Sequence, residues 1–296
     1  MDPEHVEFTA HNIRLDDGTL TKPDARWGDV SMGEASMEAW PPFVSARRII
    51  ETVFPGDKSY LRLADLGCLE GGFSVEFARM GFQVLGVEVR EANIAACNYV
   101  KAKTNLPNLE FIKDDARNIA NYGFFDVVFC CGLLYHLDKP KEFLSTLSAV
   151  TTKLLILQTH FSTDTKNKEH PRCSGIARKL LARVKRHDPE PADRYNLSEL
   201  TENETLRGRW YTEFGNDEAF SKRDSSRWAS WDNRRSFWIQ REYLLQAIHD
   251  VGFDLVMEQF DSLGPNIAEN MLGGYYKAES RGTFIGTKTG ESSAKA

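Results

Sequence analysis

Short apolar runs rich in β-forming residues alternate with longer amphipathic stretches between residues 61 and 159. Alternation on this scale predicts βαβ units and a parallel sheet. The apolar runs are continuous, as expected of strands that helices cover on both faces. The pattern predicts strands at 61–66, 82–88, 109–113, 125–131 and 153–159, with helices near 72–80, 90–104 and 140–149.

The alternation stops after residue 159 and resumes about 80 residues later. A helix near 239–251 is then followed by strands near 253–260 and 282–288. The interruption indicates an insertion after the fifth strand, so we expect an α/β protein with a Rossmann-like core. Its predicted parts are an N-terminal extension or lid (1–58), the core (59–160 and 239–290) and an inserted substrate cap (161–238).

Composition narrows the class of protein. A net charge of −6 and a pI near 5.7 argue against general affinity for nucleic acid, although local basic patches stay open. No apolar run reaches the roughly 18 residues of a membrane span, and the acidic N-terminus lacks the apolar region of a secretory signal. Five cysteines, two of them adjacent, indicate free thiols in a reducing compartment. We therefore expect a cytoplasmic protein without membrane association.

The segment "LADLGCLEGGFSVEFARMG" (63–81) is expected to form a strand, a glycine-bearing turn and a helix. Gly67 permits a tight turn, and Gly71 lets a ligand approach the backbone where the helix begins. Glu88 ends the next strand, 21 residues after Gly67, where a carboxylate can accept both ribose hydroxyls of a nucleoside. Asp115 follows the third strand and is placed to accept from an adenine amino group. Three such features at consecutive strand ends predict nucleoside binding.

The order "DLGC…GG", "GVE", "DDA" and "FDVVFCCGLLYHL" resembles the class I S-adenosylmethionine-dependent methyltransferases. The resemblance implies a seven-stranded sheet, S-adenosylmethionine as cofactor and S-adenosylhomocysteine as product. One departure is Leu69, where many members have glycine. A dehydrogenase also has a glycine-rich turn and a ribose acid, but the acidic third-strand motif and "GLLYHL" favour the methyltransferase. The resemblance implies these cofactor-binding residues: Asp65 and the glycines at the methionine end, Glu88 at the ribose, Asp115 at the adenine, and Gly67, Cys68, Gly71, Ala116 and Cys131 around them.

A second motif lies near the N-terminus. "HNIRLDDGTLTKP" (11–23) is similar to a segment that precedes the methyltransferase domain in a bacterial subgroup of this family. That subgroup includes tRNA wobble-uridine carboxymethyltransferases, whose fourth-strand motif resembles "CGLLYHL", and relatives that act on small metabolites. The resemblance therefore leaves the substrate open.

The predicted cap is expected to select the substrate, because ligands bind at the carboxyl edge of such sheets. Its stretches 207–214 and 225–238 hold four of the six tryptophans and many arginines. One interpretation is a small cap with its own core and a solvated arginine face. The other is a pocket in which arginine holds a carboxylate or phosphate while aromatic rings contact a cationic group. A cap can do both. The candidate substrate-binding residues are Trp210, Trp231, Arg234, Arg235 and Trp238, with Trp40 of the N-terminal extension, which is alternatively a hydrophobic anchor.

The sequence "FDVVFCCGLLYHLDKP" (125–140) raises the question of a metal site. Zinc typically requires four ligands, and adjacent strand residues such as Cys130 and Cys131 point to opposite faces, so we expect no metal here. Instead Tyr135 and His136 are expected to face the acceptor, with His160 after the fifth strand nearby. Either histidine is a candidate base, or a structural group that bonds only to backbone; Tyr135 is a candidate pocket wall or hydrogen-bond donor.

The sequence thus predicts an S-adenosylmethionine-dependent methyltransferase for a small polar, anionic or zwitterionic acceptor at O, N or S, for example an amino acid such as methionine. The alternative is a tRNA wobble-uridine (carboxy)methyltransferase, in which the basic amphipathic stretch 166–187 docks on RNA. A third class is a cofactor-binding scaffold without catalysis, against which the intact strand-end acids argue. The acidic pI favours the small acceptor. A homodimer stays open.

Overall fold

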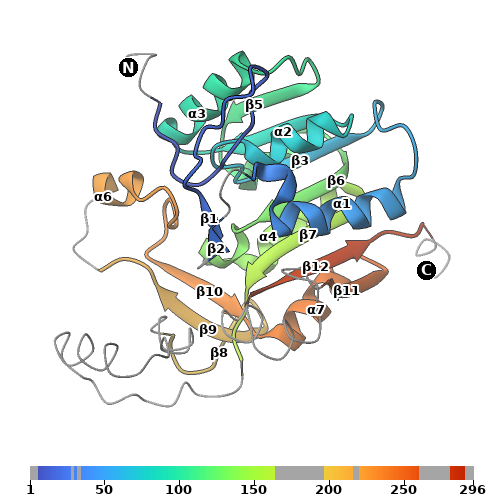
Figure 1. Cartoon of the computed structure of the whole chain (residues 1–296). Helices are drawn as coiled ribbons and strands as arrows, with labels where there is room; N and C mark the ends of the chain where they lie inside the picture. The colour runs from blue at the N-terminus through green and yellow to red at the C-terminus, as the bar shows by residue number, and fades with distance from the viewer. Residues whose placement is uncertain are drawn as a thin grey trace.

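A seven-stranded sheet forms the centre of the computed structural model, which describes residues 6–27, 30–31, 35–163, 197–215, 220–259 and 281–290. The strand order is β11-β12-β7-β6-β3-β4-β5, and β12 alone runs antiparallel to its neighbours (Figure 1). This order confirms the predicted Rossmann-like α/β core. The strands are β3 (Arg62–Leu66), β4 (Gln83–Glu88), β5 (Leu109–Lys113), β6 (Phe125–Cys131), β7 (Thr151–His160), β11 (Leu255–Gln259) and β12 (Arg281–Thr287).

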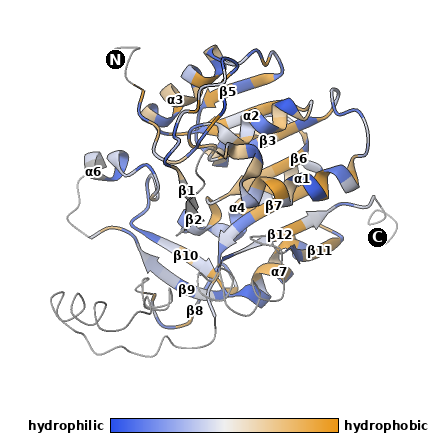
Figure 2. Cartoon of the chain, viewed as in Figure 1, coloured by the Kyte–Doolittle hydropathy of each residue, from blue (hydrophilic) through white to orange (hydrophobic). Residues whose placement is uncertain are grey.

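Helices cover both faces of this sheet, which explains why its central strands β3, β4, β6 and β7 are mostly apolar (Figure 2). One face packs against α1 (Pro41–Val53), α2 (Gly72–Arg79) and α3 (Glu91–Ala102). The other packs against α4 (Pro140–Val150) and α7 (Arg241–Asp250). Cys130 packs in the apolar core on the α4 and α7 face, and Cys131 packs against the core on the α1, α2 and α3 face. The two adjacent side chains therefore point to opposite faces of the sheet.

Helix α1 lies in the segment that the sequence predicted as a polar extension or lid. Its Phe43 packs on Phe77 of α2, with ring centroids 5.4 Å apart, and Phe77 packs on Phe129 of the sheet at 5.0 Å. Two prolines begin the helix, where the missing N–H groups have no intrahelical partner to lose. The N-terminal region is therefore partly a layer of the core.

The turn between β3 and α2 has the backbone geometry that its glycines predict. Gly67 and Gly71 have φ angles of 68° and 80°, and a Cβ on Gly71 would lie 2.5 Å from the Phe111 ring. Leu69 also adopts a left-handed φ of 53°, which costs a non-glycine residue roughly 1 kcal/mol. The turn thus keeps the open geometry of a glycine-rich loop with a leucine at its tip.

The motif at 11–23 begins at this same turn. The buried carboxylate of Glu70 accepts backbone N–H bonds from Thr9, Ala10 and His11. The Nδ1 atom of His11 in turn accepts the Gly72 N–H at 3.0 Å, at the start of α2. Burial lowers the pKa of His11 to about 4, so its ring is neutral near pH 7. The N-terminal segment is therefore held against the glycine-rich turn.

The residues between β7 and α7 include a separate antiparallel sheet, here called the cap sheet. It consists of β8 (Thr201–Asn203), β9 (Leu206–Thr212) and β10 (Arg235–Ile239), in the order β10-β9-β8. Its Glu204 accepts the N–H groups of Lys141 and Glu142, which caps the first turn of α4 and joins the cap sheet to the core. The shorter elements are β1 (Arg26–Trp27), β2 (Val30–Ser31), α6 (Phe220–Ser225) and 3-10 helices at Met37–Ala39, Ala116–Tyr122 and Leu134–His136.

The basic stretch 166–187 lies outside the described residues. Within the described part of the chain, the helices are all too short or too polar to cross a bilayer.

Candidate active site

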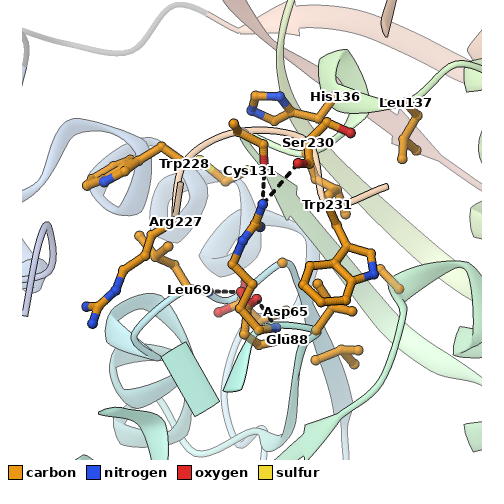
Figure 3. A pocket seen from close by; sticks show the side chains of 18 of the residues that line it. Asp65, Leu69, Glu88, Cys131, His136, Leu137, Arg227, Trp228, Ser230 and Trp231 are labelled. Carbon is orange, nitrogen blue, oxygen red and sulfur yellow. Dashed lines mark hydrogen bonds between the residues drawn. The ribbon is translucent and has the colours of Figure 1, made fainter. Parts of the chain in front are cut away.

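A cavity lies at the carboxyl edge of the central sheet, where β3, β4, β5 and β6 end. Figure 3 shows Asp65, Glu88, His136, Arg227 and Trp231 arranged around it. The N-terminal segment, the core and the segment before β10 all contribute to its walls. We call it the first cavity; its principal lining residues are His11, Trp40, Asp65, Gly67, Leu69, Glu88, Arg90, Asp115, Ala116, Arg117, Cys131, Tyr135, His136, Arg227, Trp231 and Arg281.

Asp65 sits at the inner end of the first cavity, at the end of β3. It is 2% exposed, and burial raises the pKa of its carboxyl to about 7. Ser74 Oγ donates to Oδ2 at 2.6 Å and opposes part of that rise. Among the described residues this carboxylate has no cationic partner, so a ligand ammonium group would stabilise its ionised form.

Glu88 ends the neighbouring strand and lines the same cavity. Its two carboxylate oxygens accept the N–H groups of Leu69 at 3.1 Å and Arg90 at 2.8 Å. Each oxygen retains a further lone pair for a ligand hydroxyl. Burial raises the pKa of Glu88 and the bond from the Arg90 N–H lowers it. The carboxylate is thus oriented by two backbone donors at the position where the sequence predicts a ribose.

Asp115 follows β5 and begins the 3-10 turn there. Its carboxylate is already engaged by Arg117, through Nε at 3.0 Å to both oxygens. Arg117 Nη2 also bonds Asp232, which lies in the segment before β10. These carboxylates, Asp115 first, raise the pKa of Arg117 further above its ordinary range. Arg117 was not among the predicted site residues.

The structure brings together six of the eight predicted cofactor residues. Cys68 and Gly71 do not line the first cavity: the Cys68 sulfur is buried 3.9 Å from the sulfur of Cys97, and Gly71 serves the turn. The six that line it are Asp65, Gly67, Glu88, Asp115, Ala116 and Cys131.

A second cavity lies beside the first, between the sheet edge and the cap sheet. Tyr135, His136, Arg227 and Arg281 line both cavities. On its wall the His160 ring stacks on Trp238, with centroids 4.7 Å apart and an interplanar angle of 11°. Trp228 also lines both cavities, and the other residues of the second cavity include Glu7, Thr9, Tyr211, Glu213, Ser225 and Ser226.

His136 is held by a carboxylate from the end of β9. Its Nδ1 atom lies 2.9 and 3.0 Å from the two oxygens of Glu213. The Glu213 side chain is 3% exposed and also accepts the N–H of Ser230 at 2.6 Å and the hydroxyl of Ser236. Its three donors together fix the carboxylate. Glu213 was missed by the sequence reasoning, since a glutamate in "WYTEF" gives no signal of its partner.

Three of the six predicted substrate residues line a cavity and three do not. Trp40 and Trp231 line the first cavity and Trp238 the second. The other three line neither: Trp210 packs on Phe237 in the core cluster, Arg235 lies 4.7 Å from the Trp210 ring centroid, and Arg234 is exposed. The arginines that line the second cavity are instead Arg227 and Arg281, and the first cavity has Arg90 and Arg117 as well.

Arg281 begins β12 opposite His160 at the end of β7. Its Nε donates to Gln158 at 2.9 Å, and its guanidinium lies 5.5 Å from the Tyr135 ring centroid. Within the described residues, no cluster of three or more His, Cys, Asp and Glu side chains is arranged to hold a metal ion.

Comparison with known proteins finds methyltransferases among the relatives of this chain. Residues 63–153 match a family model described as a methyltransferase domain. A Geobacillus sp. (strain WCH70) protein that carries the name of a methyltransferase is 33% identical over 119 residues, 40% of this chain and 46% of that protein. The mitochondrial ubiquinone biosynthesis O-methyltransferase of Arabidopsis thaliana is 31% identical over 93 residues, 31% of this chain and 29% of that enzyme. The chain therefore spans less than half the length of these curated relatives.

A solved structure extends the likeness of the fold beyond that domain. The N-terminal domain of EvdMO1, crystallised with S-adenosylhomocysteine and D-fucose, superposes with a TM-score of 0.55 at 20% identity. The superposition covers 88% of each chain. The chain thus has the fold of the class I S-adenosylmethionine-dependent methyltransferases. Within it, residues 63–153 are the part that matches the methyltransferase-domain model.

Proposed function

We propose that this protein transfers a methyl group from S-adenosylmethionine to a small polar acceptor, anionic or zwitterionic, bound in the second cavity. The observation that carries the proposal is the pair of adjoining cavities, with Tyr135, His136 and Arg281 on both. Such a junction would let the reacting atom of an acceptor lie beside a cofactor in the first cavity, and alignment is the main requirement of methyl transfer.

The residues of the first cavity fit the cofactor. Asp65 would hold its amino group, Glu88 its ribose hydroxyls, and the Asp115 and Ala116 turn its adenine. The cofactor supplies an activated methyl group on a sulfonium. The chain's own residues orient the two ligands, and Trp40 and Trp231 restrict water.

The second cavity supports a charged acceptor of modest size. Arg227 and Arg281 suit a carboxylate or phosphate, and Tyr135 and Trp238 present aromatic rings to a cationic end. An amino acid, methionine included, has both groups. The mixed charges of the lining, with Glu7 and Glu213 among the same residues as the arginines, favour such an acceptor over a polyanion.

The test is turnover of a metabolite panel, detected by mass spectrometry as a product heavier by one CH₂ together with S-adenosylhomocysteine. We expect turnover of a small polar acceptor, and loss of S-adenosylhomocysteine binding in Glu88→Ala. If the wild-type protein does not bind S-adenosylhomocysteine, the proposal is overturned.

The same assay distinguishes the tRNA alternative. Tight, strongly salt-dependent binding of unmodified tRNA together with methyl or carboxymethyl transfer to its wobble uridine would replace the small acceptor by RNA.

A further inference from the structure

His136, in the segment between β6 and α4, contacts Glu213 at the end of β9. Both residues line the second cavity, and His136 also lines the first. The carboxylate lies within hydrogen-bond distance of Nδ1 only; Nε2 forms no hydrogen bond with a described residue.

This contact determines which ring nitrogen carries the proton. A carboxylate only accepts hydrogen bonds, so its partner Nδ1 must be the donor, and Nε2 of the neutral ring is then left with a lone pair. The other two donors to Glu213, the Ser230 N–H and the Ser236 hydroxyl, are neutral. The buried carboxylate therefore has its negative charge available to stabilise a protonated imidazole.

We propose that Glu213 is the positioning residue for His136 as a general base, and that the methylated atom is a hydroxyl oxygen of the acceptor; this rests on the proposed function. The oxygen forms a bond to the methyl carbon while the bond from that carbon to sulfur breaks, its electron pair going to sulfur. The acceptor proton passes to Nε2 of His136 and later to solvent. A thioether, tertiary amine or carboxylate acceptor has no proton to lose and would need no such pair.

Several charged groups share the environment of this pair. Arg227, Arg281, His160 and Glu7 line the same cavity, and the Arg90 guanidinium interacts with the charge of Glu213. Arg227 is directed to Glu7 and Glu70, and Arg281 bonds Gln158, so among their described contacts each has an acceptor other than Glu213. Among these groups, His136 is the one that contacts the Glu213 carboxylate directly and can carry a positive charge when its ring is protonated.

The first experiment measures the tautomer, which needs no acceptor. The full chain is labelled with 15N-histidine and saturated with S-adenosylhomocysteine, and the His136 signal is assigned by its loss in His136→Gln. We expect the proton on Nδ1 in the wild-type protein and a mixture of tautomers in Glu213→Ala. A proton on Nε2 in the wild-type protein would overturn the inference whether or not an acceptor is known.

The second experiment measures turnover with two sets of acceptors. 3,4-Dihydroxybenzoate and D-fucose offer hydroxyl groups and no amine; L-methionine and N,N-dimethylglycine offer no hydroxyl group outside their carboxyl groups. We expect turnover of hydroxyl acceptors alone. With the acceptor that is turned over, the Glu213→Gln substitution should lower kcat roughly a hundredfold. This variant should still bind S-adenosylhomocysteine. Glu213→Asp should restore part of that loss.

The matched control is Glu204→Gln, which changes another cap glutamate whose carboxylate bonds two N–H groups away from both cavities. We expect wild-type kcat and the wild-type tautomer in this variant. Turnover of a thioether or tertiary amine, or an unchanged kcat in Glu213→Gln, would overturn the inference while leaving the methyltransferase proposal intact. Failure to bind S-adenosylhomocysteine would instead overturn the proposed function.

Discussion

Asp65 shows how burial and ligand charge act on one carboxyl. Its ligand-free pKa of about 7 means that at pH 6 the group is mostly protonated and at pH 8 mostly ionised. An ammonium group on the ligand favours the ionised form, so binding should release a proton when pH is near or below 7.

We therefore predict that affinity for S-adenosylhomocysteine rises roughly tenfold from pH 6 to pH 8 and then levels off. Calorimetry in buffers of different ionisation enthalpy measures both the affinity and the released proton. Ser74→Ala removes the donor that lowers the Asp65 pKa, so the midpoint of the pH dependence should move upward. Asp65→Asn should bind weakly and without this pH dependence; a wild-type profile that is flat between pH 6 and 8 would contradict the assignment.

The same group links stability to pH in the opposite sense. Its folded-state pKa lies above the unfolded value, so its contribution to the free energy of unfolding falls as pH rises from about 4 to about 7, by up to about 1.4 kcal/mol per pH unit. Asp65→Asn should remove this fall in the ligand-free protein. The carboxyl that we propose as a ligand for the cofactor would thus lower the stability of the ligand-free protein as pH rises.

At the residue scale, the sequence indicated that the strand-end acids share one edge of the sheet, because each has a fixed place after an apolar run. Asp65, Glu88 and Asp115 all line the first cavity. A hydrogen-bond partner that comes from a distant segment of the chain has no such fixed place in the sequence pattern. Glu213 lies 77 residues from His136, and its role depends on the register of the cap sheet.

At the element scale, the segment 227–232, which connects α6 to β10, lies along both cavities. Arg90 donates to the carbonyls of Ala229 and Ser230 at 2.7 and 3.0 Å, and Arg117 bonds Asp232. The N–H of Ser230 meanwhile bonds Glu213. One short segment therefore contacts residues beside the predicted ribose and adenine acids and the carboxylate that holds His136.

We predict that Asp232→Asn weakens binding of S-adenosylhomocysteine by about two- to fivefold, since the pair with Arg117 is partly exposed and worth less than about 1 kcal/mol. The loss should shrink at high salt, because screening already weakens the wild-type pair. Titrations at two salt concentrations provide the measurement. Asp24→Asn, which breaks the surface pair with Lys22, is the matched control and should bind as the wild type does. Equal affinities for Asp232→Asn and the wild type at low salt would contradict a role for this segment in cofactor binding.

The elements themselves were predicted unevenly, for a physical reason. The core strands have apolar runs that no other structure would bury, and their bounds agree with the predictions within about two residues. In the cap sheet the side chains alternate between two faces, and sequence does not tell which face meets the cavity. Trp238 and Trp210 therefore looked equivalent, yet one lines the second cavity and the other packs in the core.

At the scale of the whole molecule, three regions far apart in the chain meet at one residue. Arg227 of the cap donates to the carbonyl of Glu7 at 2.8 Å and lies 3.7 Å from the carboxylate of Glu70. Glu70 in turn binds the backbone of residues 9–11. The first cavity is thus completed by segments that approach from both sides of the core.

This arrangement predicts that a ligand in the first cavity orders the N-terminal segment and the cap together. Hydrogen exchange should slow at the amides of residues 9–11 and of Ser230 when S-adenosylhomocysteine is added at about 100 times its Kd, which stabilises the bound form by about 2.7 kcal/mol.

In Glu70→Gln the bonds to residues 9–11 lose their charged acceptor, so those amides should exchange faster and affinity for S-adenosylhomocysteine should fall. Glu76→Gln, which changes a buried acid of α2 paired with Arg79, is the control, because Glu76 lines neither cavity. If the ligand slows exchange only in the core and leaves the exchange of residues 9–11 unchanged, the prediction is wrong. The N-terminal segment would then only pack against the core and take no part in the site.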